Sequence, residues 1–147
     1  MNLYLRDALF LVSVLVLIAL NAFFVAAEFA LVTVRWTRVE EMVERGRFGA
    51  KAVAKALENL DDAIAATQVG ITFASLALGW VGEPALAHLL EPLFRGLPGA
   101  LGFVTTHAVA VTLAYVLLTY LHVVLGEQVP KMHAIDRAED VALIVAG

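Results

Sequence analysis

The stretch HVVLGEQVPKMHAI, residues 122–135, ends the last long apolar run of this 147-residue chain. The six residues after this run, 126–131, include Gly126, Glu127, Pro130 and Lys131. Pro130 has no amide hydrogen, and its ring collides with the carbonyl four residues back, which belongs to Gly126. If the helix continues, that oxygen loses its usual donor, and the Glu127 carboxylate stands beside it. The stretch therefore predicts a proline-broken membrane span with a group of oxygen acceptors at the break, sheltered among neighbouring helices.

The apolar residues of the chain are gathered in long blocks. They make up 61% of the sequence, and only 16% of the residues are charged, whereas about a quarter are charged in soluble domains. Three blocks suit the roughly 20 residues that a helix needs to cross a bilayer: residues 8–34, 63–81 and 103–125. We therefore expect an all-α integral membrane domain over residues 1–147.

Composition also narrows the function. The chain has no cysteine, which excludes disulfides and thiolate metal sites. No basic run suggests nucleic acid as a partner. No phosphate-cradling loop occurs either, so we do not expect an enzyme.

The segments between the spans set the expected orientation. Six of the ten basic residues lie in residues 35–62, where helical spacing of apolar residues predicts two short amphipathic helices at 36–61 along the membrane surface, broken near residues 46–49. Because positive loops stay in the cytoplasm, this pair is expected inside and the N-terminus outside. A Gly/Pro-rich connector that contains a short helix and Arg95 is expected after the second span. Residues 137–147 predict the start of a juxtamembrane helix, so we expect a fragment with a cytoplasmic continuation.

Polar side chains interrupt the first span. Glu28 lies seven residues after Asn21, on the same helix face. An acid inside the membrane needs a partner or a water-filled cavity. Two interpretations are open: an interfacial Glu28 paired with Arg35 or another interfacial cation, or a Glu28 with a role in ion binding or coupling.

The other two spans carry polar stripes at helical spacing. Such stripes either let helices pack closely or line a cavity. In the second span the stripe is Gln68, Thr72, Ser75 and Gly79. In the third it is Thr112, Tyr115, Thr119 and His122, and His122 taken alone is typical of a satisfied interior histidine.

The acceptors at the proline suit a hard cation. Gly126 has no Cβ, which permits close approach of an ion or a backbone. Mg²⁺ binds about six oxygen ligands, and broken helices that present carbonyls to ions recur in transporters. The alternative is a helix terminator at the interface, with Lys131 meeting lipid phosphates.

Three stretches carry a resemblance to a known family. They are NAFFVAAEFALVTVR (residues 21–35), TQVGITFASLALGWVGEPALA (residues 67–87) and the opening HVVLGEQVPKMHAI. Together they resemble the transmembrane domain of the CorC/cyclin M (CNNM) magnesium transporter family, whose bacterial members are often labelled hemolysin-related. The resemblance covers nearly the whole chain, and its most specific part is the G-E-x-x-P-K element at residues 126–131.

The resemblance implies an N-out domain of three spans in the cell (inner or plasma) membrane, surrounded by the lipid bilayer and assembled as a homodimer. It implies C-terminal CBS-type domains that bind ATP with Mg²⁺, and export of Mg²⁺ coupled to entry of Na⁺. The ion site is expected to use side-chain and backbone oxygens from all three spans. The expected cation ligands are Asn21, Glu28, Thr72, Ser75, Gly126 and Glu127. The residues expected to have structural or gating roles are Gln68, Gly70, His122, Pro130 and Lys131.

The chain departs from some relatives of this family. Residues 25–28 read Val-Ala-Ala-Glu where those relatives have S-G-S-E, and Ile71, Thr72 and Ser75 stand where some have asparagines. With fewer oxygen side chains, the site would rely on backbone carbonyls and retained waters, bind Mg²⁺ more weakly, or favour another ion. Two other functions stay open: a non-transporting divalent-ion sensor or regulator, and a scaffold whose polar stripes only join helices.

Overall fold

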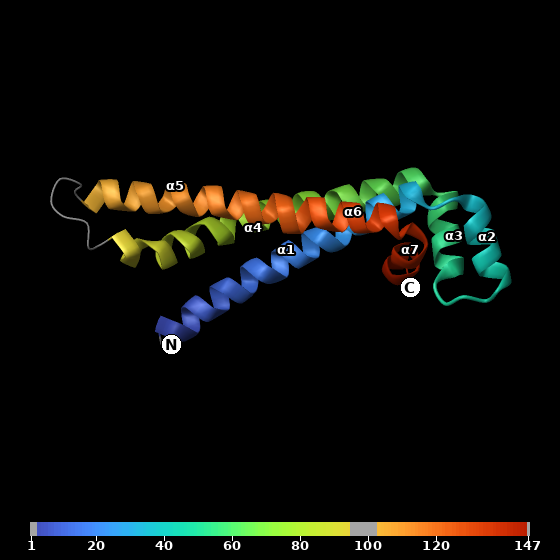
Figure 1. Ribbon diagram of the computed structural model, residues 1–147, viewed down its shortest axis with the longest axis horizontal. Helices are drawn as coiled ribbons and strands as arrows, with labels where there is room; N and C mark the ends of the chain where they lie inside the picture. Colours follow the sequence, from blue (N-terminus) through green and yellow to red (C-terminus); the bar gives the residue numbers. More distant parts are fainter. Residues whose placement is uncertain (1–2, 95–102, 147) are drawn as a thin grey trace.

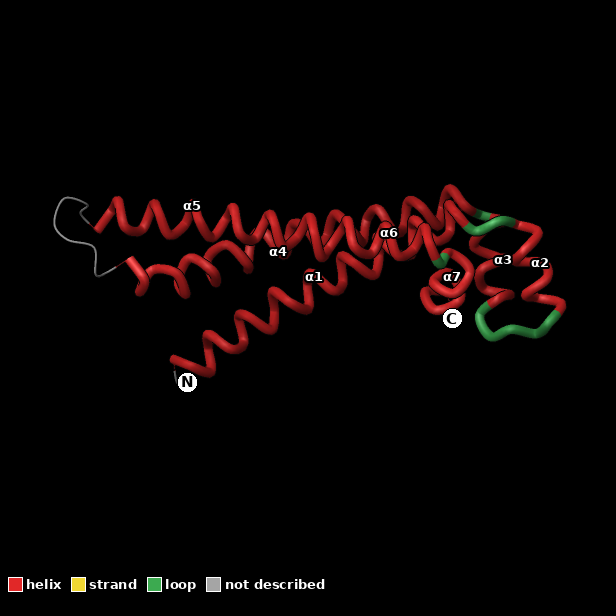
Figure 2. Tube along the Cα trace, viewed as in Figure 1, coloured by secondary structure: helices red, strands yellow, loops and turns green. Residues whose placement is uncertain are grey.

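Long helices form a bundle, and short helices cover one of its ends (Figure 1). The computed structural model describes residues 3–94 and 103–146, which contain no strand (Figure 2). Three helical rods run along the bundle: α1 (Leu3–Thr33), α4 (Leu60–Phe94), and a third made of α5 (Phe103–Leu121), the π-helix η1 (His122–Gln128) and α6 (Val129–Asp136). Each rod contains a stretch long and apolar enough to cross a membrane. The predicted all-helical fold with three spans is confirmed.

Each rod buries one narrow stripe and leaves its other faces open to lipid. On α1 the buried residues Val14, Ile18 and Val25 recur at the spacing of a single helix face. Val14 and Ile18 pack in one apolar cluster with Leu78 of α4 and Leu118 of α5, among other side chains. Because lipid is as apolar as these side chains, the exposed leucines and valines on the outside need no cover.

The second rod is longer than the sequence suggests. α4 continues through Gly82 and Pro84, where a connector with a short helix was expected. Gly82 is used for packing, because a Cβ there would lie 2.8 Å from a methyl carbon of Leu118. Pro84 removes one backbone hydrogen bond, which membrane helices tolerate. The expected position of Arg95 in the connector lies outside the described residues.

The third rod widens at the predicted break and continues. In η1 the Val129 amide donates to the Val124 carbonyl, five residues back. Pro130 lies in the first turn of α6, directly after η1, and has no amide hydrogen to donate to the preceding turn. The proline break expected from the sequence is therefore a π-helical segment within a continuous rod. Such segments are uncommon and often occur at functional sites.

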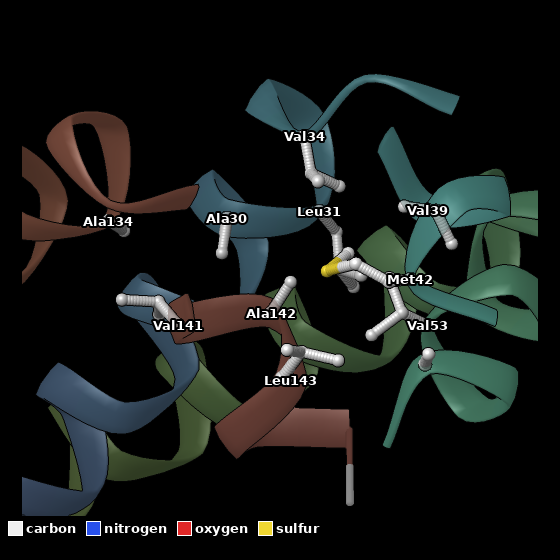
Figure 3. Packing of buried hydrophobic residues seen from close by; sticks show 11 residues of the cluster. Ala30, Leu31, Val34, Val39, Met42, Val53, Ala134, Val141, Ala142 and Leu143 are labelled. Atoms are coloured by element: carbon white, nitrogen blue, oxygen red, sulfur yellow. The ribbon is translucent and has the colours of Figure 1, made fainter. Parts of the chain in front are cut away.

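Three short helices form what we call the end layer: α2 (Trp36–Glu44), α3 (Ala50–Glu58) and α7 (Ala138–Ala146). Gly46 and Gly49, with φ of 65° and 80°, make the turn between α2 and α3. Apolar side chains from these helices and from the ends of α1 and α6 point toward one another (Figure 3). Met42 lies near the middle of this core, with Leu31 and Val53 beside it (Figure 3).

Ion pairs surround the core of the end layer. Arg38 of α2 donates to Glu139 of α7 at 2.8 Å, and Arg47 donates to Asp140 at 3.3 Å. The hydrogen bond that Arg38 donates to the Glu139 carboxylate raises the pKa of the Arg38 guanidinium. These pairs are exposed, so each contributes little to stability. The apolar core beneath them is what joins α7 to the α2–α3 hairpin.

Candidate cation site

Polar groups from all three rods meet inside the bundle. The side chain of Asn21, on α1, is fully buried. Its Nδ2 donates to the Gly126 carbonyl at 3.0 Å, and its Oδ1 accepts from the Ser75 hydroxyl of α4 at 3.2 Å. The same hydroxyl oxygen lies 3.3 Å from Nε2 of His122 in η1. Asn21, Ser75, His122 and Gly126 thus form one hydrogen-bonded chain, which we call the polar cluster.

The lack of a side chain at Gly126 makes this cluster possible. A Cβ there would lie 2.9 Å from Cδ2 of His122 and 3.2 Å from Nδ2 of Asn21. Pro130 cannot donate to the Gly126 oxygen, and the Asn21 amide supplies a donor in its place. The carbonyl predicted from the sequence to be bare is therefore bonded across the bundle to α1.

Glu127 lies at the edge of the polar cluster. Its Oε1 is 3.7 Å from Nε2 of His122, and its side chain is 40% exposed. The carboxylate is less sheltered by this chain than the sequence suggests. Because Mg²⁺ keeps several of its waters when it binds to proteins, an open side suits a partly hydrated cation.

Glu28 belongs to a separate contact. It is half-buried, two turns along α1 from Asn21, and its Oε1 accepts from Nε2 of Gln68 at 3.4 Å. Its partner is therefore an amide on α4, whereas the sequence offered Arg35. Arg35 lies in the end layer, where it lines a cavity of 410 Å³ together with Arg38.

Thr72 is not brought to the polar cluster. The buried face of α4 is set by small and apolar residues such as Ala74 and Leu78, and Ser75 lies at the edge of that face. This rotation leaves Thr72 and Gly79 exposed, with Thr72 in a shallow groove on the outside of the helix. The predicted stripe is thus divided between the inside and the outside of the bundle, because the buried apolar residues of α4 determine how the helix is rotated about its axis.

The stripe on the third rod is divided in the same way. Thr112, Tyr115 and Thr119 are exposed, and the Thr112 hydroxyl donates to its own helix at Ala108. His122 is the member of this stripe that reaches the polar cluster. The sequence predicted neither the hydrogen bond between His122 and Ser75 nor the π-helix. The spacing of four residues between His122 and Gly126 does place these two residues on one helix face.

Gly70 and Lys131 make packing contacts close to the polar cluster. A Cβ at Gly70 would lie 2.6 Å from the ring of Phe24, so glycine lets α4 cross α1 closely. The Lys131 ammonium lies 4.6 Å from the centre of the Phe29 ring, a cation–π distance. In the structure the partner of Lys131 is thus an aromatic side chain of α1.

The site lacks a dense set of charged ligands. Within residues 3–94 and 103–146, no three histidine or carboxylate side chains are grouped to hold a metal ion. A cation at the polar cluster would depend on neutral oxygens, the single carboxylate of Glu127, and water. Hard cations such as Mg²⁺ accept this mixture.

Three apolar rods joined by a polar cluster at a π-helix define a multi-pass helical membrane protein. The family model described as the cyclin M transmembrane N-terminal domain (CNNM) matches residues 12–147. The chain belongs to this family, which includes proteins related to Mg²⁺ transport.

Relatives in bacteria agree with this assignment. The chain is 46% identical over 143 residues to the UPF0053 protein YhdT of Bacillus subtilis, which covers 96% of this chain and 30% of that protein. It is 43% identical over 142 residues to the UPF0053 protein YhdP of the same organism, covering 95% of this chain and 31% of the relative. The chain therefore spans less than a third of the length of these relatives.

Proposed function

We propose that the chain is the membrane domain of a Mg²⁺ transporter that exports Mg²⁺ and uses the entry of Na⁺ to drive it. The observation that carries the proposal is the polar cluster, with Glu127 at its edge, inside a bundle whose buried side chains are mostly apolar. Polar groups among membrane helices are costly and commonly mark ion pathways. Membership of a family that includes proteins related to Mg²⁺ transport supports the same conclusion.

The chemistry of binding follows from the groups present. The Glu127 carboxylate neutralises part of the ion's charge, and oxygens of Asn21 and Gly126 replace part of its water shell. The remaining waters lie on the open side next to Glu127. Thr72 and Glu28 lie outside the polar cluster, so they are not ligands of the ion at this site.

Movement of the ion needs a bundle that rearranges around the site. Transporters of this kind rock helices against one another about a central site. The π-helix η1 is a natural place for such a change, because one residue more or less per turn shifts the face that a helix presents. Its position between α5 and α6 places this adjustable turn at Gly126 itself.

The same proposal sets the surroundings of the domain. The basic residues of the α2–α3 hairpin favour an end layer in the cytoplasm and an N-terminus outside the cell. The domain works as a homodimer in the cell membrane, followed by C-terminal CBS-type domains that bind ATP with Mg²⁺. These statements rest on charge distribution and on the family resemblance.

Mg²⁺-dependent stabilisation of the purified protein in detergent tests the site. An ion that binds only the folded state stabilises it by about 2.7 kcal/mol at a hundred times its Kd. We expect MgCl₂ to raise the thermal unfolding temperature of the parent and to have little effect on Glu127→Gln. The matched control is Glu83→Gln, because Glu83 is a half-buried acid of α4 outside the polar cluster. An unchanged response in Glu127→Gln would rule out this carboxylate as a ligand.

Flux separates transport from the two alternatives. Proteoliposomes that contain only the purified protein should move Mg²⁺ when a Na⁺ gradient is applied, and those with Glu127→Gln should not. A sensor or regulator would show Mg²⁺-dependent stabilisation without flux. A scaffold would show neither.

A further inference from the structure

The Asn21 side chain joins the three rods through both ends of its amide. The amide nitrogen faces Gly126 in η1, and the amide oxygen faces Ser75 on α4. The side chain is fully buried, so these two protein groups determine which way the amide points. It therefore occupies the junction at which a cation bound by all three spans would have to lie.

Hydrogen-bond chemistry fixes the direction of this chain. A backbone carbonyl can only accept, so the amide nitrogen of Asn21 must be the end that faces Gly126. The Ser75 hydroxyl gives its single hydrogen to Asn21 Oδ1, so its oxygen accepts from His122 Nε2. Donation thus runs in one direction, from His122 through Ser75 and Asn21 to Gly126.

This arrangement does not let Asn21 and Gly126 bind one cation together. A cation needs oxygens on the side that faces it, and the side of Asn21 that faces the Gly126 oxygen is a hydrogen donor. A half-turn of the amide about its last side-chain bond exchanges nitrogen and oxygen, which have nearly the same size. The oxygen then faces the Gly126 carbonyl, and a cation between the two is held by both.

We propose that the Asn21 amide works in two orientations: its nitrogen caps the Gly126 carbonyl in one, and its oxygen binds the cation together with that carbonyl in the other. This inference rests on the proposed function. In the turned orientation Asn21 donates to Ser75, and Ser75 donates to His122 Nε2, which accepts when the imidazole proton is on Nδ1. Ser75 and His122 are then positioning residues, and the whole chain reverses its direction while each group keeps a partner.

The variant Asn21→Asp tests the two orientations. A carboxylate has nearly the size of the amide but cannot donate, so an oxygen would face the Gly126 oxygen unless a cation lies between them. We expect Asn21→Asp to unfold at a lower temperature than the parent in EDTA. MgCl₂ should raise the unfolding temperature of Asn21→Asp by more than it raises that of the parent. The Mg²⁺ concentration at half of this gain should fall by about tenfold or more, because a charged ligand replaces a neutral one.

The chain offers a matched control at Asn59. Its Nδ2 also donates to a backbone carbonyl, that of Lys55 at 3.2 Å, but on the exposed surface of the end layer. Asn59→Asp makes the same chemical change and adds the same charge. Its unfolding temperature should depend on Mg²⁺ as that of the parent does.

A second measurement applies to the parent and does not need the variant to fold. The sequence contains three asparagines, so labelling with ¹⁵N-asparagine gives three side-chain amide signals. Mg²⁺ should shift the signal that Asn21→Leu removes and leave that of Asn59 in place. In Glu127→Gln, addition of Mg²⁺ should not shift the Asn21 signal.

The outcomes separate this inference from the proposed function. If the parent responds to Mg²⁺ and Glu127→Gln does not, but Asn21→Asp loses the response and the Asn21 signal stays fixed, Asn21 only orients the carbonyl. The two-orientation proposal is then overturned while the ion site stands. If the parent itself shows no Mg²⁺ response, the proposed function fails first.

Discussion

The polar cluster and the end layer join helices in opposite ways. The end layer buries a core of apolar side chains (Figure 3). Exposed ion pairs surround this core, as in a water-soluble protein. The bundle has no such advantage, because lipid competes for apolar side chains as well as a neighbouring helix does. It instead uses close approaches at glycines and a short chain of buried hydrogen bonds. Substitutions in the two regions should therefore differ in size, in salt dependence and in their effect on ion binding.

The largest loss of stability is expected from the core of the end layer. Met42 is 4% exposed, and Met42→Ala should cost about 2–5 kcal/mol of unfolding free energy, because it leaves a cavity in a core that water cannot fill. Thermal unfolding in detergent measures the change. Met132→Ala is the control, because Met132 is exposed on α6.

The Mg²⁺ response should survive in Met42→Ala. The substitution touches the end layer and none of the oxygens near Gly126. If the variant folds but no longer responds to Mg²⁺, the two regions are energetically coupled, and their separation into different kinds of contact is wrong.

A smaller loss of stability, with loss of ion binding, is expected at Gly126. A Cβ there would press on His122 and on Asn21, and such overpacking costs about 1–3 kcal/mol. Gly126→Ala should also abolish stabilisation by Mg²⁺, because Asn21 is pushed away from the carbonyl. The control is Gly79→Ala, since a Cβ at Gly79 meets nothing within 4 Å. A tolerated alanine at Gly126 with full Mg²⁺ response would show that close approach is not needed.

The hydrogen bond from Ser75 to Asn21 should contribute less to the unfolding free energy than the close packing at Gly126 does. Side-chain hydrogen bonds inside membrane proteins average about 0.6 kcal/mol and reach about 1.7, so Ser75→Ala should fall in that range. Ser13→Ala is the matched control, because the Ser13 hydroxyl bonds only within its own helix, to the Leu9 carbonyl. A Ser75→Ala loss no larger than that of Ser13→Ala would mean that the chain through Asn21 adds no stability.

The sequence predicts most of the fold because the dominant signal is simple. Long apolar blocks identify the three rods. The G-E-x-x-P-K element identifies Gly126 and Glu127 as candidate site residues. It does not predict the continuation of α4 through Pro84, because glycine and proline mark turns in water but also serve packing inside membranes.

The composition of the site is only partly readable from the sequence. Asn21, Ser75 and Gly126 are brought together as the family resemblance implies, but Thr72 is not. Which member of a polar stripe faces inward depends on helix rotation, and the apolar seam formed by residues such as Ala74 and Leu78 sets that rotation. The bond between Asn21 and Gly126 joins residues 105 positions apart, which no local pattern reveals.

The smallest effect is expected at the ion pair between Arg38 and Glu139. Their side chains are 52% and 37% exposed, and exposed pairs contribute about 0–1 kcal/mol. Glu139→Gln should therefore change the unfolding free energy by that amount at low salt and by almost nothing at 1 M NaCl, where charges are screened within about 3 Å.

A double-mutant cycle with Arg38→Gln isolates this pair from the neighbouring contact of Arg38 with Glu41. The salt dependence is what distinguishes the two regions, because the neutral bonds among Asn21, Ser75 and Gly126 should not respond to NaCl. A coupling between Arg38 and Glu139 above about 2 kcal/mol that persists at 1 M NaCl would mean that this pair is shielded from solvent. The end layer would then depend on desolvated polar contacts as the bundle does, and the contrast between the two regions would disappear.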